Sequence, residues 1–198
     1  MKSKSTVTII VVILLAFLLF RGCSGYNNMN ALKQQVGEAW SNVENQYKRR
    51  ADLIPNLVNT VKGAANFEQE TLTKVIEARA KATSIQLNAD DLTPEKLQEF
   101  QAAQGQLTGA LNKLLAVVES YPDLKSVQNF QNLQVELSNT ENKIATERSR
   151  FNEVVKNYNT AITSFPNLLF AGMMGFKEKG YFTATDQEKE KPNVDFSK

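Results

Sequence analysis

Apolar residues recur every three or four positions along most of the chain, and polar residues fill the positions between them. This spacing places the apolar side chains on one stripe of an α-helix. The first stripe keeps its phase on both sides of Pro55, so we expect one long helix over residues 27–87 that is kinked near this proline. A tight turn at residues 51–55, which would give two antiparallel helices, is the alternative.

Two more helices follow from the same pattern. Thr93 can cap a helix whose first position is Pro94, and the apolar stripe of this helix continues to about Ser120. After the break "SYPDLKS", a last helix is predicted over residues 124–164. The predicted fold class is therefore all-α, an up-and-down antiparallel helical bundle of three to four long helices.

Polar side chains interrupt two of these stripes. On the last helix Gln134, Glu141 and Arg148 lie seven residues apart, which is two helical turns, and they share the stripe that otherwise packs inward. On the first helix Arg50 falls within the apolar stripe, and Arg49 lies beside it. We therefore expect Arg50 to contact Glu141 or another inward carboxylate, together with carbonyl oxygens that the kink frees.

These five polar residues allow two interpretations. In the first, they form a buried network that only fixes the register of the helices. In the second, they form a site for a ligand or a partner, because polar seams in bundles can also hold cofactors. Trp40 and Tyr47 fall on or beside the first stripe, and we expect them to be core aromatics and not recognition anchors.

The first 25 residues predict membrane targeting. Two lysines precede an apolar run over residues 7–20, which is shorter than the about 20 residues that usually span a bilayer. Three interpretations remain open: an uncleaved transmembrane anchor that contacts the membrane through residues 6–26, a lipoprotein signal with lipidation at Cys23, or a cleaved signal peptide. We expect the anchor, as an N-terminal segment of residues 1–25.

Charge adds an orientation and excludes one class of partner. Lys2 and Lys4 account for the whole net charge of +2, so the rest of the chain is balanced. By the positive-inside rule these lysines place the N-terminus in the cytoplasm, and the domain that follows outside the inner membrane. A neutral domain lacks the surplus of Lys and Arg that nucleic-acid binding requires, so no nucleic acid is expected as a partner.

The chain after the last helix divides into two parts. Residues 165–182 are apolar and contain glycine, so they either fold back over one end of the bundle or dock on lipid or on a partner. Residues 183–198 are polar and are predicted to form a disordered tail. The bundle domain is therefore expected over residues 26–182.

Missing residue types limit the chemistry of the chain. It has no histidine, and its single cysteine is Cys23, which excludes Ser-His-Asp and Cys-His catalysis, His-ligated zinc and disulfides within the chain. The stretch "QGQLTG" lacks the lysine of a phosphate-binding loop. We therefore expect no enzyme, no catalytic residue, no cofactor and no metal site.

Several motifs carry a resemblance to a known family. They are "YNNMN", "EAWSNVENQYKRRADLIPNLVNTVKG", "NFEQETL" with "EAR", the long stretch from "ESYPDLKS" to "NTAITSFP", and the terminal "GYF". Together they cover most of residues 26–182 and resemble the LemA family. The resemblance implies a small bacterial membrane-anchored protein with an all-helical up-and-down bundle and no established enzymatic activity.

The expected function follows from these points. We expect a non-enzymatic envelope protein that acts as a protein-interaction or membrane-associated scaffold, with an unidentified protein or a second copy of itself as partner. The alternative is a ligand-sensing bundle with a polar core site around Arg50 and Glu141.

Overall fold

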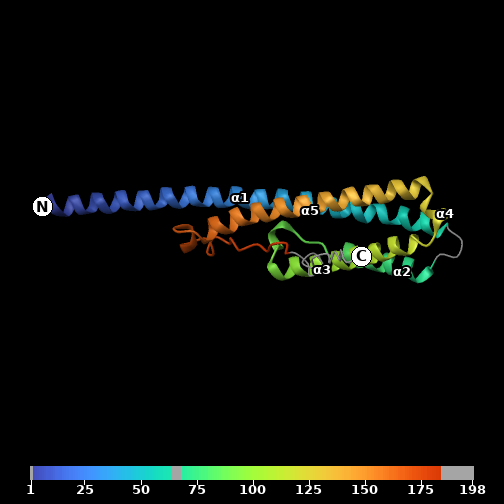
Figure 1. Ribbon diagram of the computed structural model, residues 1–198. Helices are drawn as coiled ribbons and strands as arrows, with labels where there is room; N and C mark the ends of the chain where they lie inside the picture. The colour runs from blue at the N-terminus through green and yellow to red at the C-terminus, as the bar shows by residue number, and fades with distance from the viewer. Residues whose placement is uncertain (1, 64–67, 184–198) are drawn as a thin grey trace, which may run out of the picture.

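The computed structural model describes residues 2–63 and 68–183, and it describes the side chains of residues 8, 9, 12, 13, 24–63 and 68–183. These residues contain helices and no strand, which confirms the all-α class. The elements, labelled in Figure 1, are α1 (Lys2–Lys62), α2 (Gln69–Ser84), η1 (Ala89–Asp91), α3 (Pro94–Val118), α4 (Pro122–Lys125), α5 (Gln128–Thr163) and η2 (Asn167–Leu169).

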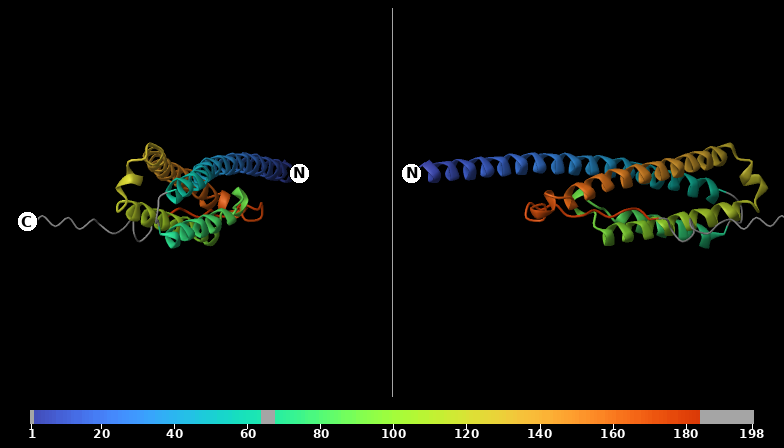
Figure 2. Two further views of the ribbon diagram at one scale, coloured as in Figure 1. Left: turned by 90° about the vertical axis from the view of Figure 1, so that its right-hand side faces the viewer. Right: turned by 60° about the vertical axis from the view of Figure 1, so that its left-hand side comes forward.

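The four long helices form two antiparallel pairs. α1 packs mainly on α5, and α2 packs mainly on α3, with fewer contacts between α1 and α2. Figures 1 and 2 show the two pairs lying side by side, and they show that α1 extends well beyond the bundle toward the N-terminus. The bundle is therefore built on one half of a much longer helix.

The first helix is shorter at its C-terminal end than the sequence predicts. α1 ends at Lys62 and α2 begins at Gln69, so the prediction of a single helix over residues 27–87 is wrong, and so is the alternative turn at residues 51–55. Gly63, which disfavours helix, follows the last residue of α1. Val61 and Leu72 are eleven residues apart, or about three helical turns, so the apolar stripe keeps its phase across the break.

Pro55 lies inside α1 and faces solvent, and the helix continues through it. Because proline has no N–H, the carbonyl of Ala51 loses its usual donor within the helix. Nε of Arg79 in α2 donates to this carbonyl oxygen at 2.7 Å. The freed carbonyl therefore joins α2 to α1 and is not an acceptor for Arg50; the kink itself stays a prediction.

The next two helices begin with proline. As predicted, Thr93 caps α3, its side chain accepting from the amide of Lys96 at 3.4 Å, and Pro94 occupies the first turn. Pro122 opens the separate short helix α4, so α5 begins at Gln128 and not at residue 124.

Buried apolar side chains form two clusters along the bundle. The cluster nearer the N-terminus joins α1 and α5 and contains Trp40 and Tyr47, as predicted for core aromatics. The second cluster joins the far end of α1 to α2, α3 and the start of α5. Between the two clusters lies a layer of polar residues.

An extended stretch of residues 177–183, here called the clamped segment, lies along α5 and reaches α3. Asn152 of α5 donates to and accepts from the backbone of Phe182, both at 2.8 Å. Asn159 pairs in the same way with Lys179, at 2.8 and 2.9 Å. Seven residues of helix rise about 10.5 Å and three residues of extended chain span about 10 Å, so the two spacings match.

Gly180 occupies the point where the clamped segment crosses the start of α3. Its amide donates to the carbonyl of Leu92 at 2.9 Å, and a Cβ atom there would lie 2.8 Å from Cα of Pro94. Both atoms belong to backbones, so neither can move aside cheaply. This crossing therefore requires glycine.

We expect Gly180→Ala to lower the free energy of unfolding by about 1–3 kcal/mol, because the added methyl overpacks a backbone contact. The measurement is urea unfolding of the full chain in detergent, followed by far-UV circular dichroism. Gly109→Ala is the matched control: it lies inside α3 with no atom within 4 Å of the new Cβ. This change should stabilise the helix by about 0.5–1 kcal/mol. Equal effects of the two changes would contradict the prediction.

Candidate functional site

The polar layer between the two apolar clusters is centred on Arg50 of α1, which is only 1% exposed. Its Nη1 donates to Oε1 of Glu141 in α5 at 2.7 Å and to Oγ1 of Thr108 in α3 at 2.9 Å. Its Nη2 donates to Oε1 of Gln104 in α3 at 2.5 Å. The structure thus brings Arg50 and Glu141 together, and it adds two acceptors from α3.

Gln104 extends this network to the remaining long helix. Its Nε2 donates to the carbonyl of Ala82 in the last turn of α2 at 3.1 Å. The guanidinium of Arg50 also lies against the ring of Tyr47, with Cζ 5.1 Å from the ring centroid. One buried cation therefore connects all four long helices, and it fixes how the α1–α5 pair sits on the α2–α3 pair.

A cleft of about 260 Å³ opens beside this network. Glu141 forms part of its wall with a side chain that is 38% exposed, so its carboxylate reaches solvent. Arg148 lies further along α5, donates through Nη2 to the carbonyl of Thr183 at 3.0 Å, and has Cζ 5.1 Å from the ring of Phe182. The cleft is lined by Tyr47, Arg50, Gln101, Gln104, Gly105, Thr108, Asn112, Glu141, Ile144 and Arg148.

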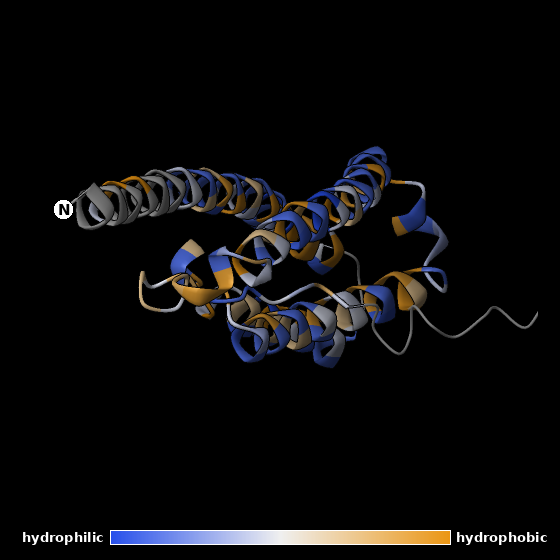
Figure 3. Cartoon of the chain, turned by 90° about the vertical axis from the view of Figure 1, so that its left-hand side faces the viewer, coloured by the Kyte–Doolittle hydropathy of each residue, from blue (hydrophilic) through white to orange (hydrophobic). Residues whose placement is uncertain are grey.

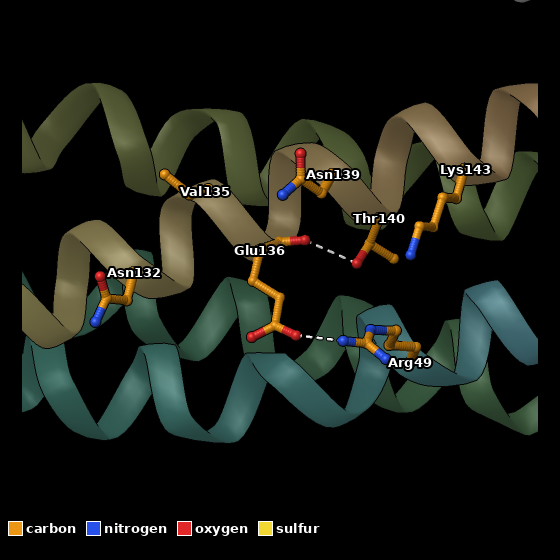
Figure 4. A pocket seen from close by; sticks show the side chains of 7 residues that line it. All are labelled: Arg49, Asn132, Val135, Glu136, Asn139, Thr140 and Lys143. Carbon is orange, nitrogen blue, oxygen red and sulfur yellow. Dashed lines mark hydrogen bonds and ion pairs between the residues drawn. The ribbon is translucent and has the colours of Figure 1, made fainter.

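Two of the predicted site residues lie away from this layer. Arg49 points to the surface and forms an ion pair with Glu136 of α5, beside a separate shallow pocket (Figure 4). Gln134 is exposed, because Leu133 beside it turns toward the core in its place.

Two members of the site, Gln104 and Thr108, were not predicted from the sequence. The signal was present, since Gln104 occupies the turn between Phe100 and Leu107, two members of the apolar stripe of α3. A polar residue in a core stripe indicates a buried hydrogen-bonding partner. Both residues lie in the stretch "QGQLTG".

Lys179 is a second buried cation, in the clamped segment. Its Nζ donates to the carbonyls of Ala89 and Asp90 at 3.0 and 2.6 Å. Burial lowers the pKa of Lys179, and the nearby Asp90 carboxylate opposes that shift. Asp90 in turn pairs with Lys33 at 2.7 Å, which lowers the pKa of its carboxyl group. Lys179 thus fastens η1 to the C-terminal part of the chain.

For the apolar segment after α5 two alternatives were predicted, folding back over the bundle or docking as an exposed patch, and the first is observed for part of the segment. Ala171 and Phe176 are buried against the bundle, whereas five other large apolar side chains are exposed. The exposed side chains, here called the apolar tip, are those of Phe165, Leu168, Leu169, Met173 and Met174. The segment therefore covers one end of the bundle and also presents an apolar surface.

The predicted membrane anchor and the predicted lipidation site lie mostly in residues whose side chains the structure does not describe. The backbone of residues 2–26 is helical and continuous with the bundle. The side chains of residues 14–23, including Cys23, lie outside the described residues, as do residues 184–198. Within the part of the chain that the structure describes, no helix is both long and apolar enough to cross a membrane. Anchoring and lipidation therefore stay predictions.

Known proteins resemble this chain over most of its length. The model of the LemA family matches residues 39–196. Magnetosome protein MamQ 1 of Paramagnetospirillum magneticum is 30% identical over 202 residues, which cover 93% of this chain and 71% of that protein. Protein LemA of Metamycoplasma hominis is 26% identical over 163 residues, covering 82% of this chain and 71% of its own length.

Proposed function

The chain belongs to the LemA family, and from this premise we propose that it is a non-enzymatic, membrane-anchored protein whose helical bundle acts as a rigid scaffold at the bacterial envelope. The observation that carries the proposal is the continuity of α1 from Lys2 to Lys62. The same helix holds the apolar run of residues 7–20 and packs along α5 in the bundle. A continuous helix of this kind holds the bundle at a fixed distance from the membrane, because no hinge separates the anchor from the bundle.

The interior of the bundle supports a structural role for its polar residues. The guanidinium of Arg50 is engaged by acceptors from α3 and α5, and Gln104 is engaged on both sides of its amide. Buried polar side chains whose hydrogen bonds join different helices hold those helices in register. The scaffold offers its outer surface to a partner protein or to a second copy, with the N-terminus in the cytoplasm as Lys2 and Lys4 favour.

The anchor is tested by placing carboxylates in the apolar run. We expect the double variant Val12→Asp and Ile13→Asp to be washed from membranes by alkaline carbonate, whereas the unchanged protein stays. Each acidic group at mid-membrane disfavours insertion by about 2.5–3.5 kcal/mol. Val135→Asp is the control, because Val135 is as exposed as these residues but lies on α5. Retention of the double variant would contradict the anchor.

The scaffold itself is tested by crosslinking in native membranes. We expect the anchored protein to give a discrete crosslinked product, either with a second copy or with one partner, and the washed-out double variant to lose it. Absence of any product from the anchored protein would contradict the scaffold and leave the anchor intact.

Ligand sensing, the second candidate function, is favoured by one observation. Nε of Arg50 is buried and has no hydrogen-bond partner, and the cleft of about 260 Å³ lies beside the same residue. An anionic ligand in the cleft would also meet Arg148. If the cleft binds such ligands, citrate should raise the melting temperature of the protein, and Arg148→Gln should abolish the rise. No shift with citrate would count against this function.

A further inference from the structure

The apolar tip is an outward-facing surface built on a segment whose other side is fixed. Its five residues are 44–85% exposed, whereas Phe176 close by in sequence is only 7% exposed. The backbone between them is held by hydrogen bonds from the amide of Ala171 to the carbonyl of Asn167 and from the amide of Phe176 to the carbonyl of Ala171. The tip therefore has an inner and an outer face, and its exposed side chains are not loose ends of the core.

The tip lies where α1 leaves the bundle. The rings of Tyr26 in α1 and Phe176 meet edge to face, with centroids 5.6 Å apart. A Cβ atom placed on Gly25 would lie 2.6 Å from Oδ1 of Asn167 and 3.7 Å from the ring of Phe170. Figure 3 looks onto this end of the molecule and shows the loop with its hydrophobic residues beside α1.

The distance from this contact to the N-terminal apolar run is short. Residue 20, the last of the run, precedes Gly25 by five residues, which is about 7.5 Å along a helix. If the run lies in the hydrocarbon core, the tip lies at the depth of the headgroups. The end of the run therefore lies within about 7.5 Å, along the helix, of the residue that the tip contacts.

We infer that the apolar tip inserts into the headgroup region of the bilayer as a second membrane contact, next to the exit of α1. The inference rests on the proposed anchor. Phe and Leu are among the side chains that monotopic segments bury at this boundary, and the two Met residues add further apolar surface. Two contacts at different points fix the tilt of the rod, which one helix alone leaves free.

The area of the tip favours lipid over a second copy of the chain. A large apolar side chain offers about 150–250 Å². Five such side chains, each partly exposed, present about 600 Å², which is less than the about 800 Å² per partner of a stable protein interface. A lipid surface has no such minimum, because the anchor already holds the tip against it.

The test uses the full chain in lipid nanodiscs of phosphatidylcholine and phosphatidylglycerol that hold one copy each. With Cys23 replaced by serine, a single cysteine at Met173 carries an environment-sensitive fluorophore, and Leu169→Cys provides a second site. The matched controls are Val135→Cys in the first third of α5 and Val127→Cys just before α5, at the far end of the bundle, both exposed apolar positions.

We expect the emission from positions 169 and 173 to shift to shorter wavelength and to be quenched by nitroxide-labelled headgroups, while both controls stay aqueous. An aqueous signal at position 173 in loaded discs would overturn the tip contact and leave the anchor standing. A shift that appears only in discs with two copies would overturn it in favour of self-association. Failure of the protein to enter discs at all would overturn the anchor, and the inference with it.

Discussion

Replacing Arg50 with methionine is expected to lower the free energy of unfolding by about 3 kcal/mol. The loss comes chiefly from α3, where the buried Gln104 keeps an acceptor without its charged donor, and such an unsatisfied buried group costs about 1–3 kcal/mol. Thr108 also loses its donor, but it is only partly buried. Glu141 contributes less, because its side chain is 38% exposed and its carboxylate can be hydrated. The measurement is urea unfolding of the full chain in detergent.

Three further variants separate the contributions to this effect. Arg49→Met removes a surface ion pair with Glu136 and should change stability by less than about 1 kcal/mol. Glu141→Gln keeps an acceptor for Arg50 and should cost about 1 kcal/mol. Gln104→Leu added to Arg50→Met should recover part of the loss, because removing a whole buried polar set is often tolerated. If Arg50→Met were neutral, the layer would not hold the helices together.

Part of this layer could be predicted from the sequence. Periodicity placed Arg50 and Glu141 on inward stripes of two helices, and the structure joins them at 2.7 Å. Periodicity placed Gln134 on the inward stripe as well, and this was wrong. Whether Leu133 or Gln134 packs inward depends on how α5 crosses α1 over several turns. Spacing along one helix sets a face only approximately, and the neighbouring helix decides which of two adjacent residues is buried.

The break after Lys62 shows a second limit of periodicity. A stripe that resumes after eleven residues has the same phase whether the helix continues or ends and restarts, so the pattern from Val61 to Leu72 does not separate the two cases. Gly63 was the only local signal of an end, and a single glycine is tolerated inside many helices.

The extended conformation of the clamped segment could not be predicted, because it depends on distant residues. Residues 177–183 have no apolar period, and several of their backbone partners are amide side chains on α3 and α5. Asn152 and Asn159 lie seven residues apart on α5, which is visible in the sequence. Only the structure shows that this spacing matches three residues of extended chain.

Phe182→Ala is expected to lower the free energy of unfolding by about 3–5 kcal/mol, the usual range for deleting a buried ring. Phe182 is 5% exposed and carries the clamped segment into the core. Its ring stacks on Trp40 with centroids 6.3 Å apart and meets Phe151 edge to face at 5.4 Å. Asn152 holds the backbone of Phe182 in place, so the surrounding residues cannot close the cavity easily.

Two measurements check this prediction. Urea unfolding gives the change in stability, and the emission of Trp40, the single tryptophan of the chain, should move to longer wavelength as water approaches its ring. Phe165→Ala removes the same atoms from a residue that is 81% exposed, and in detergent it should change stability by less than about 0.5 kcal/mol. Similar effects of the two changes, or an unchanged Trp40 spectrum in Phe182→Ala, would mean that the clamped segment covers the bundle without supporting its core.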